Sequence, residues 1–358
     1  MSNFEIKTKI LNVKGVDFKV PESFEIDRDV SRKFSPAIVA IDNKSKKRFF
    51  VKILRLDIEP LHYTRIDVAS LLAHFYLTSS KTVKLQHLIL PDDFPKSKNV
   101  FKIVEYMETT LLSIINSSQT MTPNHVRYFL YQILLHLNYL HSHNLSLSYF
   151  TPRSFLVNSD CELKLSKPLH EFRMNCNRIH QIKQYNDCSD CTRWYLPPES
   201  FIENESNLKS DMWGLGCIFY ELVMRKPLFP GKDDKMMIKI QIEGLGKLDE
   251  SDIELVKSEK ARNFLIKSEF KMNSLFDRIE GVCDDGMFIL RNLLVFNPDK
   301  RMSAIECLIH PYFEEFFIEE DLFFEFKNFD RVFDALYMEE GKLFSRVAEL
   351  AKEIEGSV

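Results

Sequence analysis

The sequence predicts an α+β fold with two lobes: a small antiparallel β-sheet lobe with one main helix, and a large, mainly helical lobe. The first hundred residues carry four short β-type runs, FKVPESFEI, PAIVAID, KRFFVKIL and VFKIVEY, around one helical patch, Arg65 to Leu77. After Met107 the spacing of apolar residues becomes helical, and the long amphipathic segments are 126–143, 212–224 and 285–294.

The change of pattern near EYMETT predicts how the chain is divided. We expect residues 1–106 to form the sheet lobe, residues 107–312 the helical lobe, and residues 313–358 an extension that packs back on the body. The last segment of this extension, EEGKLFSRVAELAKEI, is amphipathic and is expected to cover the small lobe as a helix.

Composition limits the possible functions. Of the 358 residues, 45% are hydrophobic and 28% charged, which is enough to bury a large core. A net charge of −4 provides no general basic field, so nucleic acid is not expected as a ligand. The start of the chain has no apolar signal core, and the most apolar helix is interrupted by polar residues, so no membrane span is expected. Seven irregularly spaced cysteines suit a reducing compartment, and a soluble protein of the cytoplasm, the nucleus or both is predicted.

A polar loop follows the strongest helical segment and is a candidate site. The helix predicted over 126–143 runs into SHNLSLSYFTPRS, after which FLV and ELKL predict a pair of strands. Loops held between regular elements often carry function.

Several motifs, in order from about Phe24 to the C-terminal end, resemble those of mitogen-activated protein kinases of the CMGC group. VFKIVEYMETTL is similar to that family's hinge, and RYFLYQILLHLNYLHSHN to its E helix. TRWYLPPES, DMWGLGCIFYELVMRKPLFPGKD and LLVFNPDKRMSAIECLIHPYF are similar to the segments that follow its activation loop. The resemblance implies the bilobed protein-kinase fold.

The same resemblance implies that the residues of phosphoryl transfer have been replaced. Tyr149 stands where the family has its catalytic aspartate, Thr151 where it has a lysine, and Ser154 where it has the magnesium-binding asparagine. A tyrosine titrates near about pH 10 and cannot act as the base. Lys167 stands at the metal-binding aspartate of the D-F-G triplet and would repel the cation.

The nucleotide site is expected to be degenerate as well. Lys52 matches the phosphate-contacting lysine, Asp67 its glutamate partner, and Glu105 and Met107 the hinge. Phe50 shares a strand face with Lys52, where the family has a small alanine, and is expected to fill the adenine site. The segment DVSRKFS, which matches the Gly-rich loop, has no glycine. No cofactor is therefore expected. The other reading of Lys52 and Asp67, which Phe50 favours, is a surface ion pair that contributes little to stability.

Other positions resemble the family's structural residues. Glu199 and Arg301 match a buried ion pair, and Asp211 matches an aspartate that holds the backbone of the catalytic loop. Buried charges persist when they are paired, so these three residues predict the fold and not an activity.

The segment 173–191 matches the activation loop but lacks the family's Thr-x-Tyr pair. Four of its residues have a spacing that is compatible with tetrahedral zinc, although ordinary thiols in a loop are the alternative reading. The possible ligands are Cys176, His180, Cys188 and Cys191.

An acidic segment follows HPYF near the C-terminal end. Glu319, Glu320 and Asp321 match the patch with which these kinases bind basic, hydrophobic docking peptides. The alternative is a solvated acidic face.

We therefore expect a pseudokinase that scaffolds or regulates protein partners of a signalling pathway. One alternative is an active serine/threonine kinase with an atypical ATP and Mg²⁺ site, in which a different carboxylate binds the metal; the other is an ATP sensor without turnover. The carboxylates available to the first alternative are Asp160, Glu162 and Glu171.

Overall fold

The computed structural model describes residues 6–31, 35–57, 61–76, 82–144, 146–147, 150–166, 192–203, 207–267, 270–271, 274–322, 334–335 and 337–356. Contacts divide the chain into two compact units. The first contains Met1–Glu108, Lys164–His170 and Glu325–Val358, and the second contains Thr109–Leu163 and Glu171–Phe324.

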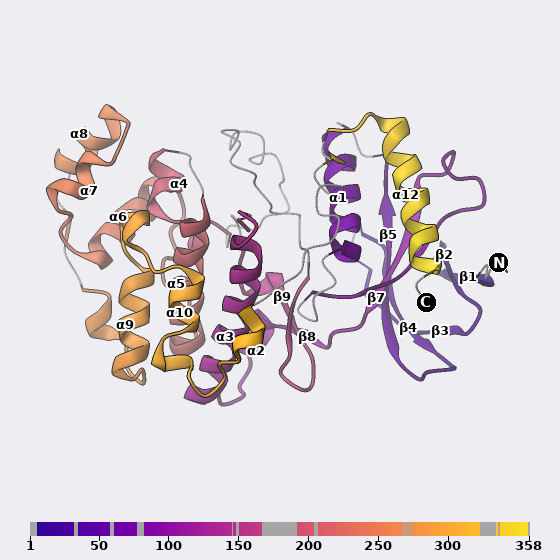
Figure 1. Ribbon diagram of the computed structural model, residues 1–358, viewed down its shortest axis with the longest axis horizontal. Helices are drawn as coiled ribbons and strands as arrows, with labels where there is room; N and C mark the ends of the chain where they lie inside the picture. The colour runs from indigo at the N-terminus through magenta and orange to yellow at the C-terminus, as the bar shows by residue number, and fades with distance from the viewer. Residues whose placement is uncertain are drawn as a thin grey trace. The chain divides into compact units, whose positions relative to one another are not determined.

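The first unit contains a five-stranded antiparallel sheet in the order β3-β4-β5-β7-β6 (Figure 1). Its strands are β3 (Phe24–Asp29), β4 (Ala37–Asp42), β5 (Arg48–Arg55), β7 (Asn99–Glu105) and β6 (Leu85–Ile89). Apolar residues occupy the middle of β4 and β5, where most of the buried positions lie, and the ends of β5 are exposed arginines.

A separate hairpin precedes this sheet. Strands β1 (Thr8–Val13) and β2 (Val16–Pro21) pair antiparallel around Lys14 and Gly15, which both have positive φ angles of 52° and 84°. Two such residues form the tight turn that matches the twist of a hairpin. Phe18 and Val20 of β2 are fully buried in the core of this unit.

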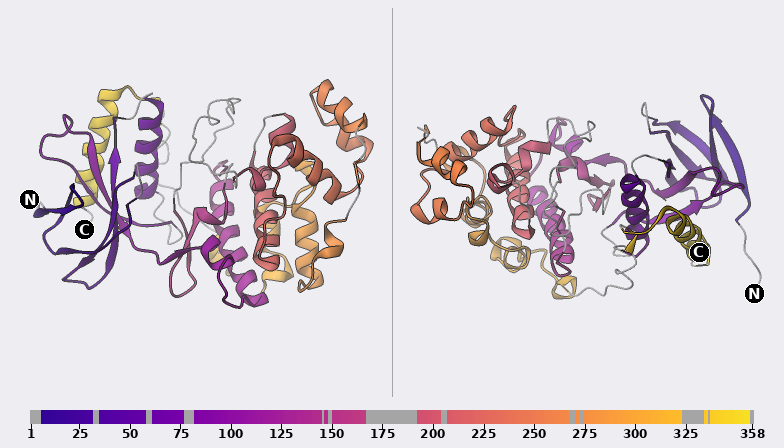
Figure 2. Two further views of the ribbon diagram at one scale, coloured as in Figure 1. Left: turned by 180° about the vertical axis from the view of Figure 1, so that it is seen from behind. Right: turned by 90° about the horizontal axis from the view of Figure 1, so that it is seen from above.

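Two helices complete the first unit, α1 (His62–Tyr76) and α12 (Glu340–Glu355). The C-terminal helix α12 packs against α1 and β6, and the views in Figure 2 show it beside α1. The hydroxyl of Tyr76 donates to Glu353 at 2.9 Å, and Nε of Arg65 donates to the carbonyl of Met338 at 2.8 Å. The amphipathic pattern of residues 339–354 therefore corresponds to a helix whose apolar face is buried.

The second unit is mainly helical. Its longest helices are α3 (Pro123–His141) and α5 (Leu208–Met224), and α5 is buried along almost its whole length. Helix α3 begins at an N-cap threonine, Thr122, followed by a proline, and α5 begins at Asn207, whose side chain accepts from two backbone N–H groups. The shorter helices are α2 (Leu111–Ile115), α4 (Pro198–Ile202), α6 (Asp234–Leu245), α7 (Glu250–Glu254), α8 (Glu259–Lys267), α9 (Asp284–Leu293) and α10 (Ala304–Leu308).

Short strands flank the loop that the sequence singled out. FLV forms β9 (Phe155–Val157), which pairs antiparallel with β8 (Thr109–Thr110), and LKL forms β10 (Leu163–Leu165). Among the helices in the described part of the chain, none has the length and apolarity that crossing a membrane requires.

Candidate functional site

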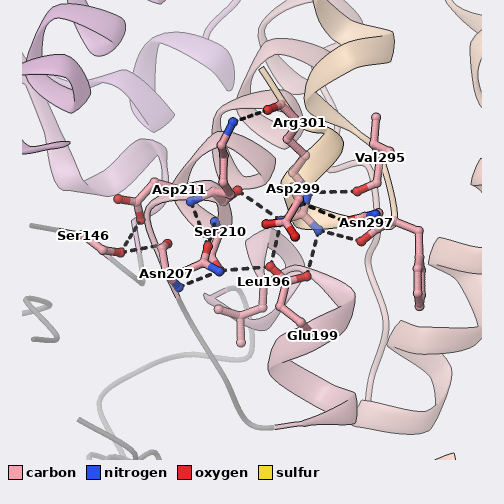
Figure 3. Close-up of polar contacts among 12 residues, drawn as sticks. Ser146, Leu196, Glu199, Asn207, Ser210, Asp211, Val295, Asn297, Asp299 and Arg301 are labelled. Carbon is pink, nitrogen blue, oxygen red and sulfur yellow. Dashed lines mark hydrogen bonds and ion pairs between the residues drawn. The ribbon is translucent and has the colours of Figure 1, made fainter. Parts of the chain in front are cut away.

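Glu199 and Arg301 form an ion pair in the second unit (Figure 3). The Arg301 side chain is 0% exposed, and its Nη1 and Nη2 atoms donate to the two oxygens of Glu199 at 2.7 and 2.8 Å. Its other three N–H groups donate to the carbonyls of Val295, Lys209 and Phe296 at 2.8–3.0 Å. All five donors of this guanidinium therefore have acceptors, which is what makes a buried arginine tolerable.

Asp211 lies in the first turn of α5 and contacts the segment that follows α3. Its carboxylate accepts from the backbone N–H of Leu147 at 2.8 Å, from the hydroxyl of Ser146 at 3.1 Å and from Nε2 of His141 at 3.0 Å. Figure 3 shows Ser146 close to Asp211, with Ser210 next to Asp211. The hydroxyl of Ser210 donates to Glu199 at 2.9 Å and so connects the two charged groups.

The loop after Leu147 uses its side chains to cap its own backbone. Ser154 Oγ accepts from the N–H of Thr151 at 3.2 Å, and Thr151 Oγ1 accepts from the N–H of Arg153 at 3.1 Å. These contacts form a capping box around a single 3₁₀ turn, Pro152–Ser154. Thr151 and Ser154 thus point at the backbone. Tyr149 lies outside the described residues, as does Lys167.

Strand β5 places Phe50 and Lys52 on the same face of the sheet, because side chains alternate along a strand. The cross-strand neighbours of Phe50 are Val39 and Val104, and both Phe50 and Lys52 are half-buried. Asp67 lies on α1, and Lys52 and Asp67 each have an interaction partner. On the opposite face of β5, Phe49 stacks on Phe24 with 5.0 Å between ring centroids.

Glu105, which the sequence predicted as a hinge residue, lies at the end of β7 and is held by contacts that the sequence did not reveal. Nζ of Lys164 lies 2.8 and 2.9 Å from its two carboxylate oxygens, and the N–H of Lys84 donates to one of them at 2.7 Å. The N–H of Glu105 itself donates to the carbonyl of Lys84. Met107 is buried. Lys164 is the residue that sequence reasoning missed, since nothing local connects it with a strand 59 positions earlier.

The acidic segment lies on a single 3₁₀ turn, Glu319–Leu322. Glu319 and Glu320 are exposed, whereas Asp321 is half-buried and accepts from the hydroxyl of Tyr131 of α3 at 3.4 Å. Burial raises the pKa of Tyr131, and the nearby carboxylate of Asp321 raises it further, so this hydroxyl stays protonated and donates. Ile318, next to the acids, is 54% exposed. This surface therefore joins negative charge with an exposed apolar side chain.

The candidate zinc ligands all lie outside the described residues, and no group of three or more possible ligands occurs within the part of the chain that the structure describes. The alternative metal carboxylate Glu162 accepts from the side chain of Asn158 at 2.8 Å, within the turn between β9 and β10. Glu171 lies outside the described ranges.

Comparisons with known proteins agree with this geometry. A family model described as protein kinase domain matches residues 33–313. Mitogen-activated protein kinase homolog NTF3 of Nicotiana tabacum is 33% identical over 316 residues, which is 87% of this chain and 79% of that protein. Mitogen-activated protein kinase homolog 1 of Petunia hybrida is 32% identical over 87% of this chain and 77% of its own length. Extracellular signal-regulated kinase 1 of Dictyostelium discoideum is 30% identical over 84% of this chain and 57% of its own length.

The matched range includes both the Glu199–Arg301 pair and the loop around Thr151 and Ser154. The α+β fold expected from the sequence is the fold of that family. This chain belongs to the mitogen-activated protein kinase family of protein kinases.

Proposed function

We propose that this member of the family does not transfer phosphate and instead regulates or scaffolds signalling proteins by binding them. One observation carries the proposal: the hydroxyls of Thr151 and Ser154, at the positions of the family's lysine and metal-binding asparagine, cap the backbone of their own loop. A neutral hydroxyl is a weaker ligand for a hard cation than an amide or carboxylate oxygen. A kinase needs positioned charges around the phosphates and metal, and this loop supplies none at those two positions.

Phe50 supports the same conclusion for the nucleotide. Its half-buried ring lies on the face of β5 that carries Lys52, between neighbours on β4 and β7. A phenyl ring there would occupy volume that an adenine ring needs. The nucleotide site is therefore filled by the protein's own side chain, that of Phe50.

The acidic segment supports binding of a partner. Glu319 and Glu320 are exposed beside Ile318, and Asp321 is fixed by Tyr131. A peptide with basic residues next to an apolar one would match this surface in both charge and character. We place this activity in the cytoplasm, the nucleus or both.

A phosphotransfer assay tests the first half of the proposal. Wild type and Lys52→Met would be compared with ATP and Mg²⁺ on a general basic protein substrate. We expect equal signals at the level of a blank reaction. Phosphate transfer by wild type that disappears in Lys52→Met would show an active kinase and contradict the proposal.

A peptide titration tests the second half. A fluorescent peptide with two arginines next to a leucine pair would be titrated with wild type, with Glu319→Lys/Glu320→Lys and with the matched control Glu254→Lys/Glu259→Lys, whose residues are exposed elsewhere in the second unit. We expect about tenfold weaker binding for the first variant and no change for the control, with an effect that shrinks as salt increases. Equal binding by all three proteins would mean that the acids are only a solvated surface.

A further inference from the structure

A groove of about 520 Å³ opens in the second unit at a place that no part of the proposed function uses. It lies between the connection from α2 to α3, the first turns of α3, the C-terminal end of α5 and the segment that precedes α9. This volume is in the range of pockets that hold small organic ligands. Most of its side chains are apolar, among them Met121, Val126, Leu222, Val223 and Val282.

Arg225 brings one positive charge to this groove. It ends α5 in the left-handed conformation, with φ 59°, and its Nη2 atom donates to the carbonyls of Ser117 and Gln119. Its Nη1 atom is buried and has no hydrogen-bond acceptor among the described residues. The side chain is thus fixed at one end of the guanidinium while the other end is left without a partner.

Arg127 of α3 brings a second positive charge. Its Nη1 atom lies 3.2 Å from a carboxylate oxygen of Glu315, and its guanidinium lies 5.1 Å from the ring centroid of Tyr312. Its Nε atom is buried and, within the described part of the chain, lacks an acceptor. Two arginines that line the same groove therefore each keep one buried nitrogen without an acceptor among the described residues.

A buried donor without an acceptor destabilises a fold, and more so when the group is charged, so an unpaired one needs an explanation. Here both such groups belong to arginines that line one largely apolar groove. We propose that this groove is a binding site for an organic carboxylate with an apolar body, whose carboxylate is held by Arg127 and Arg225. Glu280, which is exposed and also lines the groove, disfavours an anion at that side, so the carboxylate would enter toward the arginines.

Cys283 gives a direct readout, because it is exposed and lines the groove. The rate of its alkylation by iodoacetamide would be followed by peptide mass spectrometry with octanoate, with neutral 1-octanol and with acetate. The half-buried Cys161 serves as an internal control. We expect octanoate to slow alkylation of Cys283 severalfold, acetate and 1-octanol to do so only weakly, and Cys161 to be unaffected.

Charge removal makes the test specific. Arg127→Gln and Arg225→Gln should each raise the octanoate concentration for half protection at least about tenfold, as loss of a charged hydrogen bond predicts. Arg291→Gln, an exposed arginine of α9 that does not line the groove, is the matched control and should leave that concentration unchanged.

A filling variant covers the case in which an arginine variant fails to fold. Val282→Trp should slow alkylation of Cys283 without any ligand and remove the effect of octanoate. The proposal is wrong if 1-octanol protects as well as octanoate, if the arginine variants bind as wild type does, or if octanoate gives no protection. The first result would show an apolar groove without charge recognition, with water as the partner of the two buried nitrogens.

Discussion

Two polar clusters in the second unit make contacts of different kinds. Glu199, Arg301 and Asp211 are charged groups that bond to segments far away along the chain. The hydroxyls of Thr151 and Ser154, which the sequence matched to a lysine and an asparagine of the family, bond to the backbone of their own loop. A buried charge that loses its partner destabilises the whole fold, whereas a hydroxyl that caps one turn contributes only locally.

The contacts of Thr151 and Ser154 have a local effect on the turn that they cap. A threonine at an N-cap and a serine three residues later satisfy backbone N–H groups that the short 3₁₀ turn would otherwise leave unpaired. The two hydroxyls thus stabilise this turn locally. The difference between the two clusters can be measured as what each contributes to the free energy of unfolding.

The largest effect is expected for Arg301→Met. Removing the guanidinium leaves the carboxylate of Glu199, whose side chain is only 12% exposed, without its partner. We expect the free energy of unfolding to fall by about 3–5 kcal/mol, measured by denaturant titration.

Two further variants serve as controls for that measurement. Arg291→Met, at an exposed arginine near the ring of Phe276, should cost no more than about 1 kcal/mol. Glu199→Gln keeps the shape of the side chain while removing its charge, and serves if Arg301→Met does not fold. A loss for both Arg301→Met and Glu199→Gln as small as that of the control would mean that the buried pair does not hold the fold.

A smaller effect is expected in the replaced loop. Thr151→Ala and Ser154→Ala each remove one cap and should each lower the free energy of unfolding by roughly 1 kcal/mol. Because the two caps share one turn, the double variant should cost less than the sum of the single ones. Strictly additive losses would argue against the reciprocal contact.

The smallest effect concerns pH and Glu221 of α5, which is 2% exposed and accepts a hydrogen bond from the hydroxyl of Tyr195. Burial raises the pKa of this carboxyl above its ordinary value of 4.5, and the hydrogen bond from Tyr195 offsets part of the rise. In the window between 4.5 and the raised value the folded state holds more protons than the unfolded state. The stability that protonated Glu221 contributes is therefore complete below pH 4.5, and it is lost as the pH rises through the pKa of Glu221 in the folded state.

The variant Glu221→Gln tests the direction of this pH dependence. Between pH 4.5 and 7, wild type should lose more stability than the variant, as followed by chemical unfolding at each pH. A wild-type stability that rises more steeply with pH than that of Glu221→Gln would reverse the argument.

The lobes could be predicted from local patterns, but the run FKVPESFEI is divided between β2 and β3, and strands β1 and β6 were not predicted. The predicted helices were placed correctly except at their ends. The sequence predicted a helix over 126–143, whereas α3 spans Pro123–His141, and the apolar run that carried the prediction begins after the cap. The start of α5 was missed for the same reason, since Asn207 and the polar turn after it precede the apolar residues. Thr122 followed by proline, and Asn207, were local signals that would have corrected both.

The contacts of the candidate site join residues that are far apart in the sequence. They could be predicted only for residues that belong to a family motif. The resemblance predicted the pair of Glu199 and Arg301, which lie 102 positions apart. It did not predict the three carbonyls that accept the other N–H groups of Arg301. The contact of Lys164 with the carboxylate of Glu105 could not be predicted, because Lys164 belongs to no motif that we identified. The groove with Arg127 and Arg225 is built from segments that are distant along the chain, so neither residue stood out in the sequence.

The central claim, that the nucleotide site is filled and unused, is tested most directly by thermal unfolding with millimolar ATP, with and without Mg²⁺. Wild type, Phe50→Ala and the matched control Phe49→Ala would be compared, since Phe49 lies on the opposite face of β5 against Phe24. A ligand at about 100 times its dissociation constant adds about 2.7 kcal/mol, which is readily seen as a shift. We predict a shift for Phe50→Ala and none for wild type or Phe49→Ala; a Mg²⁺-dependent shift for wild type would contradict the account.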